Sequence, residues 1–204
     1  MTTIGFLFAP EPSAEATQLF DDDMAELGFV MNASRLWAYQ PGTVNSLFDL
    51  MKAALSGAGL RLRERGILVT ACASTFGDSY CSLAWGSKLA KWADAETAAA
   101  VLRGEDGPLS DAERALADWA RKVARYPSGI APADVQTLRD AGFQDSQIFA
   151  ITTFVALRIA FSTVNDALGA RPDAQFHTTV PAAVLDAVTW GRPIAEPAEP
   201  GGVE

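Results

Sequence analysis

The chain has 204 residues, of which 49% are hydrophobic and 20% are charged, so it can bury a substantial core and does not have the composition of a disordered segment. Its formal net charge is −9, and Lys and Arg form no cluster, which argues against a nucleic-acid backbone or an anionic membrane surface as a partner. The length suits one compact unit or two closely fused helical halves.

The cysteine content and the amino terminus indicate the compartment. Cys72 and Cys81 are too few for a disulfide framework in a chain of this length and fit a reducing environment. The amino terminus lacks the basic region of a signal peptide, and its apolar run is short. No window approaches the roughly 20 apolar residues of a membrane span. We therefore expect a cytoplasmic protein that does not enter a membrane.

Apolar residues recur at helical spacing along most of the chain, and no segment of useful length alternates as a half-buried strand does. The fold class is therefore predicted to be all-α. Residues 1–12 are expected to form an extended arm, residues 13–191 one helical domain, and residues 192–204, rich in Pro and Gly, a flexible tail.

Capping residues and glycines set the boundaries of the predicted helices. Ser110 and Glu113 form a capping box at one start, and Gly57 is expected to end the third helix. Gly66–Phe76 and Phe149–Leu168 are apolar around most of their circumference, so they should be the two most buried helices. In chain order, helices are predicted at residues 13–26, 32–39, 43–56, 66–76, 79–93, 95–102, 110–125, 133–141, 147–168 and 182–190.

The rest of the chain is organised around the stretch Glu64–Trp85, which predicts two helices that meet at a turn. Gly77 can close the first helix in a left-handed conformation, and Asp78 or Ser79 can cap the second. Cys81 then lies in the first turn of the second helix. Unpaired backbone N–H groups and the positive end of the helix dipole favour a thiolate there.

This stretch resembles the carboxymuconolactone decarboxylase and AhpD-like (alkylhydroperoxidase-related) family. The hallmark of that family is a Glu near the start of a buried helix, a Cys-x-x-Cys at the junction, and a His four residues after the second Cys. The resemblance implies a peroxidatic and a resolving thiol, with Glu and His as proton relays. In this chain Asp78 stands in place of the first Cys, Cys81 matches the second, Trp85 replaces the His, and Gly66 replaces the Glu.

The resemblance extends beyond the motif. Asp23–Trp37 looks like the entry segment of the peroxidase-related subgroup, and Leu138–Ile148, continuing to Asn165–Gly169, looks like its closing helix. Together these segments cover roughly residues 13–172. The resemblance implies an AhpD-like helical bundle that forms a homo-oligomer.

A thiol peroxidase needs a thiolate, a resolving thiol and a proton source. Cys81 could supply the thiolate, but Cys72 lies six residues before Asp78, inside the preceding helix, and is a poor resolving partner. The helix dipole stabilises a first-turn thiolate by ~0.3–1 kcal/mol, whereas a carboxylate at about 4 Å opposes ionisation by roughly 4 kcal/mol at an effective dielectric near 20. We therefore expect Cys81 to be protonated and inert toward peroxide.

Other acid–base groups are few. Glu64 lies two residues from the position of the family's Glu, about 200° around the helix, and is interpreted as a charged first-turn residue. His177, the only histidine, is predicted to be a surface loop residue. One His and two separated Cys do not make a zinc site, and no Gly-rich phosphate loop is present, so we expect neither a metal nor a cofactor.

Three functions remain open. The first is an oligomeric binding protein without peroxidase activity, in which Gly66, Tyr80 and Trp85 line a closed or apolar pocket that holds a small-molecule ligand. The second is a one-cysteine alkylhydroperoxide-reducing enzyme that uses Cys81 with an external thiol reductant. The third is a lyase or isomerase that acts on a small organic acid with Asp78 as the base.

Overall fold

The computed structural model describes residues 3–197, and their regular secondary structure is helical apart from two strands of two residues each, which confirms the all-α prediction. In chain order the elements are β1 (Thr3–Ile4), β2 (Leu7–Phe8), α1 (Ala14–Leu27), α2 (Asn32–Trp37), α3 (Pro41–Ala58), α4 (Leu62–Phe76), α5 (Ser79–Trp92), α6 (Ala95–Arg103), α7 (Asp111–Arg125), the 3-10 turn η1 (Pro127–Gly129), α8 (Pro132–Asp140), α9 (Asp145–Ala167), α10 (Phe176–Thr179) and α11 (Ala182–Ala187).

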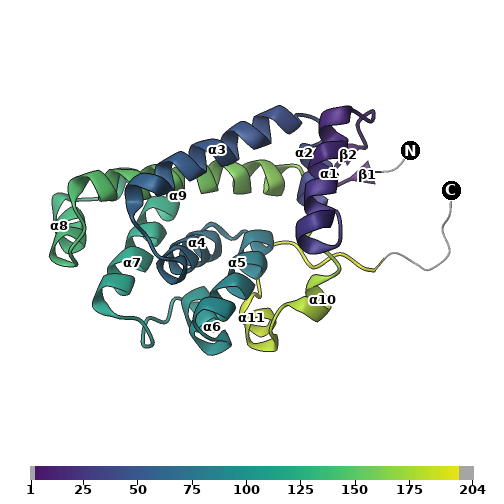
Figure 1. Cartoon of the computed structure of the whole chain (residues 1–204). Coiled ribbons are helices and arrows are strands. Elements are labelled where there is room, and N and C mark those ends of the chain that lie inside the picture. The colour runs from purple at the N-terminus through teal and green to yellow at the C-terminus, as the bar shows by residue number, and fades with distance from the viewer. Residues whose placement is uncertain (1–2, 198–204) are drawn as a thin grey trace.

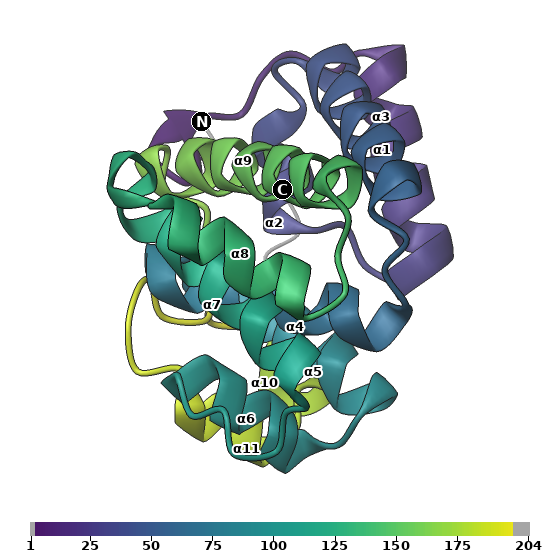
Figure 2. The same cartoon turned by 90° about the vertical axis from the view of Figure 1, so that its left-hand side faces the viewer.

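The helices form two layers. Helices α3 and α9 lie side by side in the upper layer of Figure 1, and α4 to α7 lie beneath them. Helix α4 is the central element of the lower layer, because it contacts α5, α6, α7 and α9. In Figure 2 the long helices α1 and α3 stand on one side of the molecule, and α6 and α11 lie together at its lower end.

Burial follows this arrangement. Helix α4 is buried on all sides from Gly66 to Ala73, as predicted. The prediction for the last long helix is wrong, because α9 is buried on one side only and Phe149 near its start is 75% exposed. The short helix α6 is enclosed instead, with every residue from Thr97 to Leu102 buried. Small alanine side chains let α6 pack closely between α4, α5 and α11.

Most helix ends confirm the predicted signals. Ser110 and Glu113 form the expected capping box: the Ser110 N–H donates to the Glu113 carboxylate at 2.9 Å, and the Glu113 N–H donates to the Ser110 hydroxyl oxygen at 3.3 Å. Gly57 does not end the third helix, which continues to Gly59 with φ of 66°. A Cβ at Gly57 would lie 3.4 Å from the Ala150 Cβ, so this glycine lies at the close approach of α3 and α9.

The amino-terminal arm is a two-stranded hairpin rather than an extended segment. Thr3 pairs with Phe8, and Ile4 with Leu7. The Phe6 N–H donates to the Leu168 carbonyl at 2.9 Å, which fixes the hairpin to the end of α9. Strands of two residues are too short to show alternation in the sequence.

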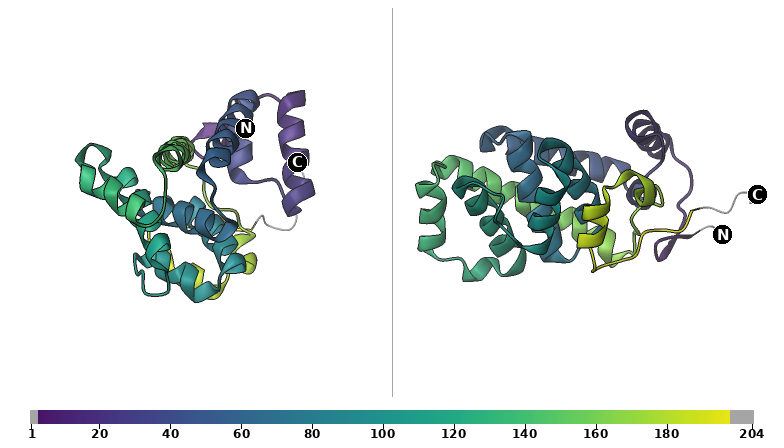
Figure 3. Two further views of the ribbon diagram at one scale, coloured as in Figure 1. Left: turned by 60° about the vertical axis from the view of Figure 1, so that its left-hand side comes forward. Right: turned by 90° about the horizontal axis from the view of Figure 1, so that it is seen from below.

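The segment after α11 is also fixed, although the sequence predicts a flexible tail from residue 192. The Ser79 hydroxyl donates to the Arg192 carbonyl at 2.7 Å, and the Ala195 N–H donates to the Pro172 carbonyl at 2.8 Å. Figure 3 shows the segment running from α11 toward the end of the molecule that carries the hairpin. The rest of the expected tail, residues 198–204, lies outside the described residues.

Helix α9 overturns the prediction that no window reaches the composition of a membrane span. Its best window has a mean hydropathy of 1.6, and within residues 3–197 it is the one helix long and apolar enough to cross a membrane. A core helix passes the same test of length and composition, and 44% of this window is buried inside the fold. The buried side packs on α3, α4 and α7.

Candidate functional site

The turn between α4 and α5 forms as the sequence predicts. Gly77 adopts φ of 85° and donates its N–H to the Ala73 carbonyl at 3.0 Å, which closes α4. Asp78 is the N-cap of α5, and its Oδ1 accepts the Cys81 N–H at 2.9 Å. The side chains of Asp78 and Cys81 are therefore held on the same side of the turn.

The carboxylate of Asp78 is fully buried, with 0% exposure. Its second oxygen accepts the Ser162 hydroxyl of α9 at 2.5 Å. Both carboxylate oxygens therefore have donors, which offsets the cost of burying the charge.

Cys81 is 3% exposed, and α9 supplies its polar contacts. The Arg158 Nη2 donates to the Cys81 Sγ at 3.1 Å, and the Ser162 hydroxyl lies 3.8 Å from the same sulfur. Burial raises the pKa of Cys81 far above its ordinary value, and the charge of Asp78 raises it further, while Arg158 opposes both. The balance favours the thiol, although burial is a larger cause than the carboxylate from which the sequence-based prediction argued.

Cys72 does not supply a reactive thiolate in place of Cys81. It is a free, buried thiol on α4, and burial raises its pKa to about 12. Cys81 is also a free thiol, so the two cysteines are not joined.

Trp85 lies one turn after Cys81, is 7% exposed and is surrounded by cations. Its ring centroid lies 5.0 Å from the Arg65 Cζ, 5.1 Å from the Lys88 Nζ and 5.3 Å from the Arg158 Cζ. Trp92 packs edge-on against it at 6.4 Å. We call Arg65, Trp85, Lys88 and Arg158 the Trp85 cluster.

The cations of the Trp85 cluster form no salt bridges. Within residues 3–197, no carboxylate oxygen lies within 4.0 Å of Arg65, Lys88 or Arg158. Burial lowers the pKa of Arg65, and the charge of Arg158 lowers it further. The cluster therefore carries positive charge that nearby ion pairs do not neutralise.

Two residues expected in the pocket are placed elsewhere. A Cβ at Gly66 would lie 3.1 Å from the Trp92 Cε3, so Gly66 serves the close packing of α4 on α5. The buried Tyr80 hydroxyl donates to Asp173 and accepts the Ala33 N–H at 3.3 Å, in a separate network that joins α5 to α2. Of the predicted set, the structure brings together Asp78, Cys81 and Trp85.

Glu64 and His177 both lie outside the site. The Glu64 carboxylate accepts the Arg61 N–H at 2.8 Å and pairs with the Arg61 guanidinium, as expected for a first-turn residue. His177 is exposed on α10 rather than in a loop. Among the residues that the structure describes, no group of three or more His, Cys, Asp or Glu could hold a metal ion.

Sequence reasoning missed Arg158 and Ser162, which complete the site from α9, about 80 residues after Cys81. A signal was present, because Arg158 is the only basic residue of α9 and Ser162 follows one turn later in an apolar helix. The spacing places both side chains on one face, but it does not identify the partner of that face.

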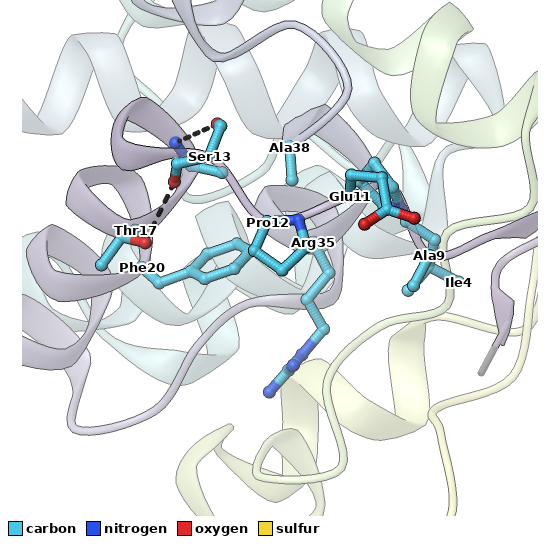
Figure 4. A pocket seen from close by; sticks show the side chains of 11 residues that line it. Ile4, Ala9, Glu11, Pro12, Ser13, Thr17, Phe20, Arg35 and Ala38 are labelled. Atoms are coloured by element: carbon cyan, nitrogen blue, oxygen red, sulfur yellow. Dashed lines mark hydrogen bonds between the residues drawn. The ribbon is translucent and has the colours of Figure 1, made fainter. Parts of the chain in front are cut away.

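A separate pocket of ≈170 Å³ lies between the hairpin, the start of α1 and α2. Figure 4 shows the Phe20 ring beside the Arg35 side chain, with Pro12 and Ser13 above them. It is mainly apolar, and Asp78, Cys81 and the Trp85 cluster do not line it. The pocket therefore does not belong to the α4–α5 site.

No family model matches the sequence, and no curated protein matches it. Several solved structures are similar to this chain in fold. An alkylhydroperoxidase AhpD core, an uncharacterised peroxidase-related protein from Ralstonia eutropha JMP134, is 25% identical with a TM-score of 0.75 over 86% of this chain and 96% of that one. A peroxidase-related protein from Silicibacter sp. TM1040 is 23% identical with a TM-score of 0.75 over 87% and 96%. The debrominase Bmp8 is 17% identical with a TM-score of 0.70 over 92% and 98%.

Proposed function

This chain belongs to the AhpD-like, peroxidase-related proteins, and from that premise we propose that it is a homo-oligomeric binding protein that has lost peroxide-reducing chemistry. One observation carries the proposal: Cys81, the single thiol at the junction, is enclosed with 3% exposure, and this burial raises its pKa. A thiol that is neither accessible nor ionised reacts slowly with peroxide.

The substitutions at the motif positions support the same proposal. Asp78 provides no second thiol at the junction, and Cys72 is buried inside α4. Trp85 cannot relay a proton, and Gly66 leaves no room for a carboxylate unless Trp92 moves. The AhpD-like frame is retained, while the groups that the family uses for chemistry are replaced.

A one-cysteine peroxidase is the second candidate, and one contact favours it. The guanidinium of Arg158 lies 3.1 Å from the Cys81 sulfur and would stabilise a thiolate. The third candidate, a lyase with Asp78 as base, is disfavoured because both oxygens of that carboxylate already accept hydrogen bonds. A variant of the debrominase has been solved in complex with 2,3,4-tribromopyrrole, but it is only 17% identical to this chain, so we draw only the fold from it.

Peroxide reduction with a dithiol reductant tests the loss of chemistry. We expect no turnover by the wild-type protein and no reaction of either cysteine with a thiol reagent until denaturant is added. Turnover comparable to that of a reconstructed site, Asp78→Cys with Trp85→His, would overturn the proposal. Adding Gly66→Glu to that pair is a harsher reconstruction, because the new side chain must displace Trp92.

The outer face of α9 supports the homo-oligomer. A shallow apolar hollow there is lined by Phe149, Thr152, Thr153, Ala156 and Leu157. Phe149 is 75% exposed, and Leu50 on the neighbouring α3 is 58% exposed. We expect sedimentation at micromolar concentration to show a species larger than 21.6 kDa, and Phe149→Glu to dissociate it. A wild-type species of 21.6 kDa would contradict this part of the proposal.

A further inference from the structure

We propose that the Trp85 cluster is a binding site for a small organic oxyanion, a carboxylate or a related group carried on a flat apolar body. This deepens the proposed binding function, on which it rests, by naming the class of ligand. The site is built from α4, α5 and α9, and its cations lie outside the positions of the family motif.

Positively charged side chains lie close together in the Trp85 cluster. Arg65 and Arg158 both lie over the ring of Trp85, so their guanidinium carbons are no more than about 10 Å apart. Like charges in a partly buried place repel one another: burial lowers the pKa of Arg65, and the charge of Arg158 lowers it further. An anion bound between them would relieve the repulsion.

The Trp85 cluster also contains guanidinium N–H groups without a hydrogen-bond partner among residues 3–197. Arg158 is 6% exposed, and its Nε is buried without a hydrogen-bond partner within residues 3–197. The Nε of Arg65 is also buried without a hydrogen-bond partner among these residues. Buried polar groups are normally paired, so these two guanidinium donors, which lie in one cluster without a paired carboxylate, are available to an acceptor. A planar carboxylate matches the fork of an arginine.

Acidic groups near the cluster do not fill this role. The oxygens of Asp78 are occupied by the Cys81 N–H and the Ser162 hydroxyl. Glu26 acts on Lys88 electrostatically but is exposed and makes no salt bridge with it. Within residues 3–197, no carboxylate is therefore paired with Arg65, Lys88 or Arg158, and the net charge of the site stays positive.

The surroundings indicate the rest of the ligand. Arg65 also lies over Phe154 at 6.0 Å, and Arg158 lies over Phe161 at 5.3 Å. These rings and Trp85 provide apolar contact around the cations. Arg65 is half-buried and Lys88 is exposed, so a ligand can approach from their side, with Arg158 at the inner end. An oxyanion with an aromatic or flat aliphatic body fits both features.

Benzoate is the probe, with acetate and inorganic phosphate as comparators. The chain has five tryptophans, and we expect benzoate to quench a part of their fluorescence that Trp85→Phe removes. Titration calorimetry on the full chain should show saturable binding that weakens with added salt. Benzoate should bind at least about tenfold more tightly than acetate, because only benzoate carries an extended apolar surface that can be removed from water at the site.

Variants assign the binding to the cluster. Arg65→Met and Arg158→Lys should each weaken benzoate binding about tenfold or more, the first by removing a charge and the second by removing only the fork. Arg125→Met removes an exposed arginine from α7, outside the cluster, and should leave binding unchanged. Circular dichroism checks that each variant is folded. If Arg158→Lys does not fold, the half-buried position of Arg65 still provides the test.

Each other outcome overturns the inference in a distinguishable way. Absence of saturable binding, or equal affinity in Arg65→Met, excludes the site. Phosphate binding as tightly as benzoate excludes the requirement for an apolar body. Dissociation of the oligomer by Arg65→Met, with no effect of benzoate, would show that a carboxylate of a second copy fills the cluster. Peroxide turnover is measured separately, so failure of the proposed function is not confused with failure of this site.

Discussion

Two arginines near the amino end of α4 lie on different sides of the helix, and only one of them is paired with a carboxylate. On one side Arg63 pairs with Glu113, with the Nε and Oε1 atoms 2.6 Å apart. Two residues later, about 200° around the helix, Arg65 has no carboxylate within 4.0 Å among the described residues and lies over Trp85. The chain has 25 acidic and 16 basic residues, so unpaired arginines do not reflect a shortage of acids. The ion pair of Arg63 contributes to the stability of the fold. The positive charge of Arg65 is not neutralised by a paired carboxylate and, in our proposal, is used to bind a ligand.

Removing the carboxylate of Asp78 should have the largest effect on the free energy of unfolding. Asp78→Ala deletes the cap of α5, leaves the buried Ser162 hydroxyl only the Cys81 sulfur 3.8 Å away as an acceptor, and removes the negative charge beside Cys81. We expect a loss of about 3–4 kcal/mol in the free energy of unfolding, measured with urea. Asp94→Ala, which removes the exposed cap of α6, should cost only about 1 kcal/mol. Equal losses would show that Asp78 is merely a cap.

The contrast between the two arginines can be tested on its own. Glu113→Ala removes both the ion pair with Arg63 and the capping box of α7, and should cost about 2 kcal/mol. Arg65→Met should change stability by no more than about 0.5 kcal/mol, and in the favourable direction, because it relieves repulsion from Arg158. A loss from Arg65→Met as large as that from Glu113→Ala would remove the distinction between the two sides.

A smaller effect concerns Asp166, which extends the electrostatics of the site along α9. Burial and the charge of Asp78 raise its pKa to about 6 from 3.8. The folded protein then binds this proton more tightly than the unfolded chain, so the stabilisation is complete below about pH 4 and is lost as the pH rises through about 6.

Asp166→Asn should therefore stabilise the protein near pH 8 by about 1 kcal/mol, with much of this gain absent near pH 4. The measurement is the difference in urea midpoints between variant and wild type at the two pH values, which cancels the titration of other carboxylates. A difference in midpoints that does not depend on pH would show that the pKa of Asp166 is not raised in the folded protein.

Local signals predicted most of the helices and the turn of the site. Gly77 and Asp78 end one helix and begin the next for reasons contained in a few neighbouring residues. The same reasoning failed where a glycine serves packing instead of a helix end. Gly57 lies inside α3, and the reason is Ala150, which lies far along the chain.

The site was only half predictable for the same reason. Asp78, Cys81 and Trp85 lie on one helix or its cap, so spacing brings them together. Arg158, Ser162 and the orphaned guanidinium donors belong to contacts between helices, which periodicity does not define. Tyr80 was misplaced because its position on α5 directs it to Asp173, in a segment for which the sequence predicts no regular structure.

The segment after α11 affects the order in which the site is completed during synthesis. The carbonyl of Gly77 would lie 2.8 Å from a Cβ at Gly191, and Ser79 donates to Arg192. The cover over the α4–α5 junction is thus made by residues that leave the ribosome more than 100 positions after Asp78. A nascent chain that has folded α4, α5 and α9 still exposes this turn, so the junction is open to small molecules and chaperones until the last segment arrives.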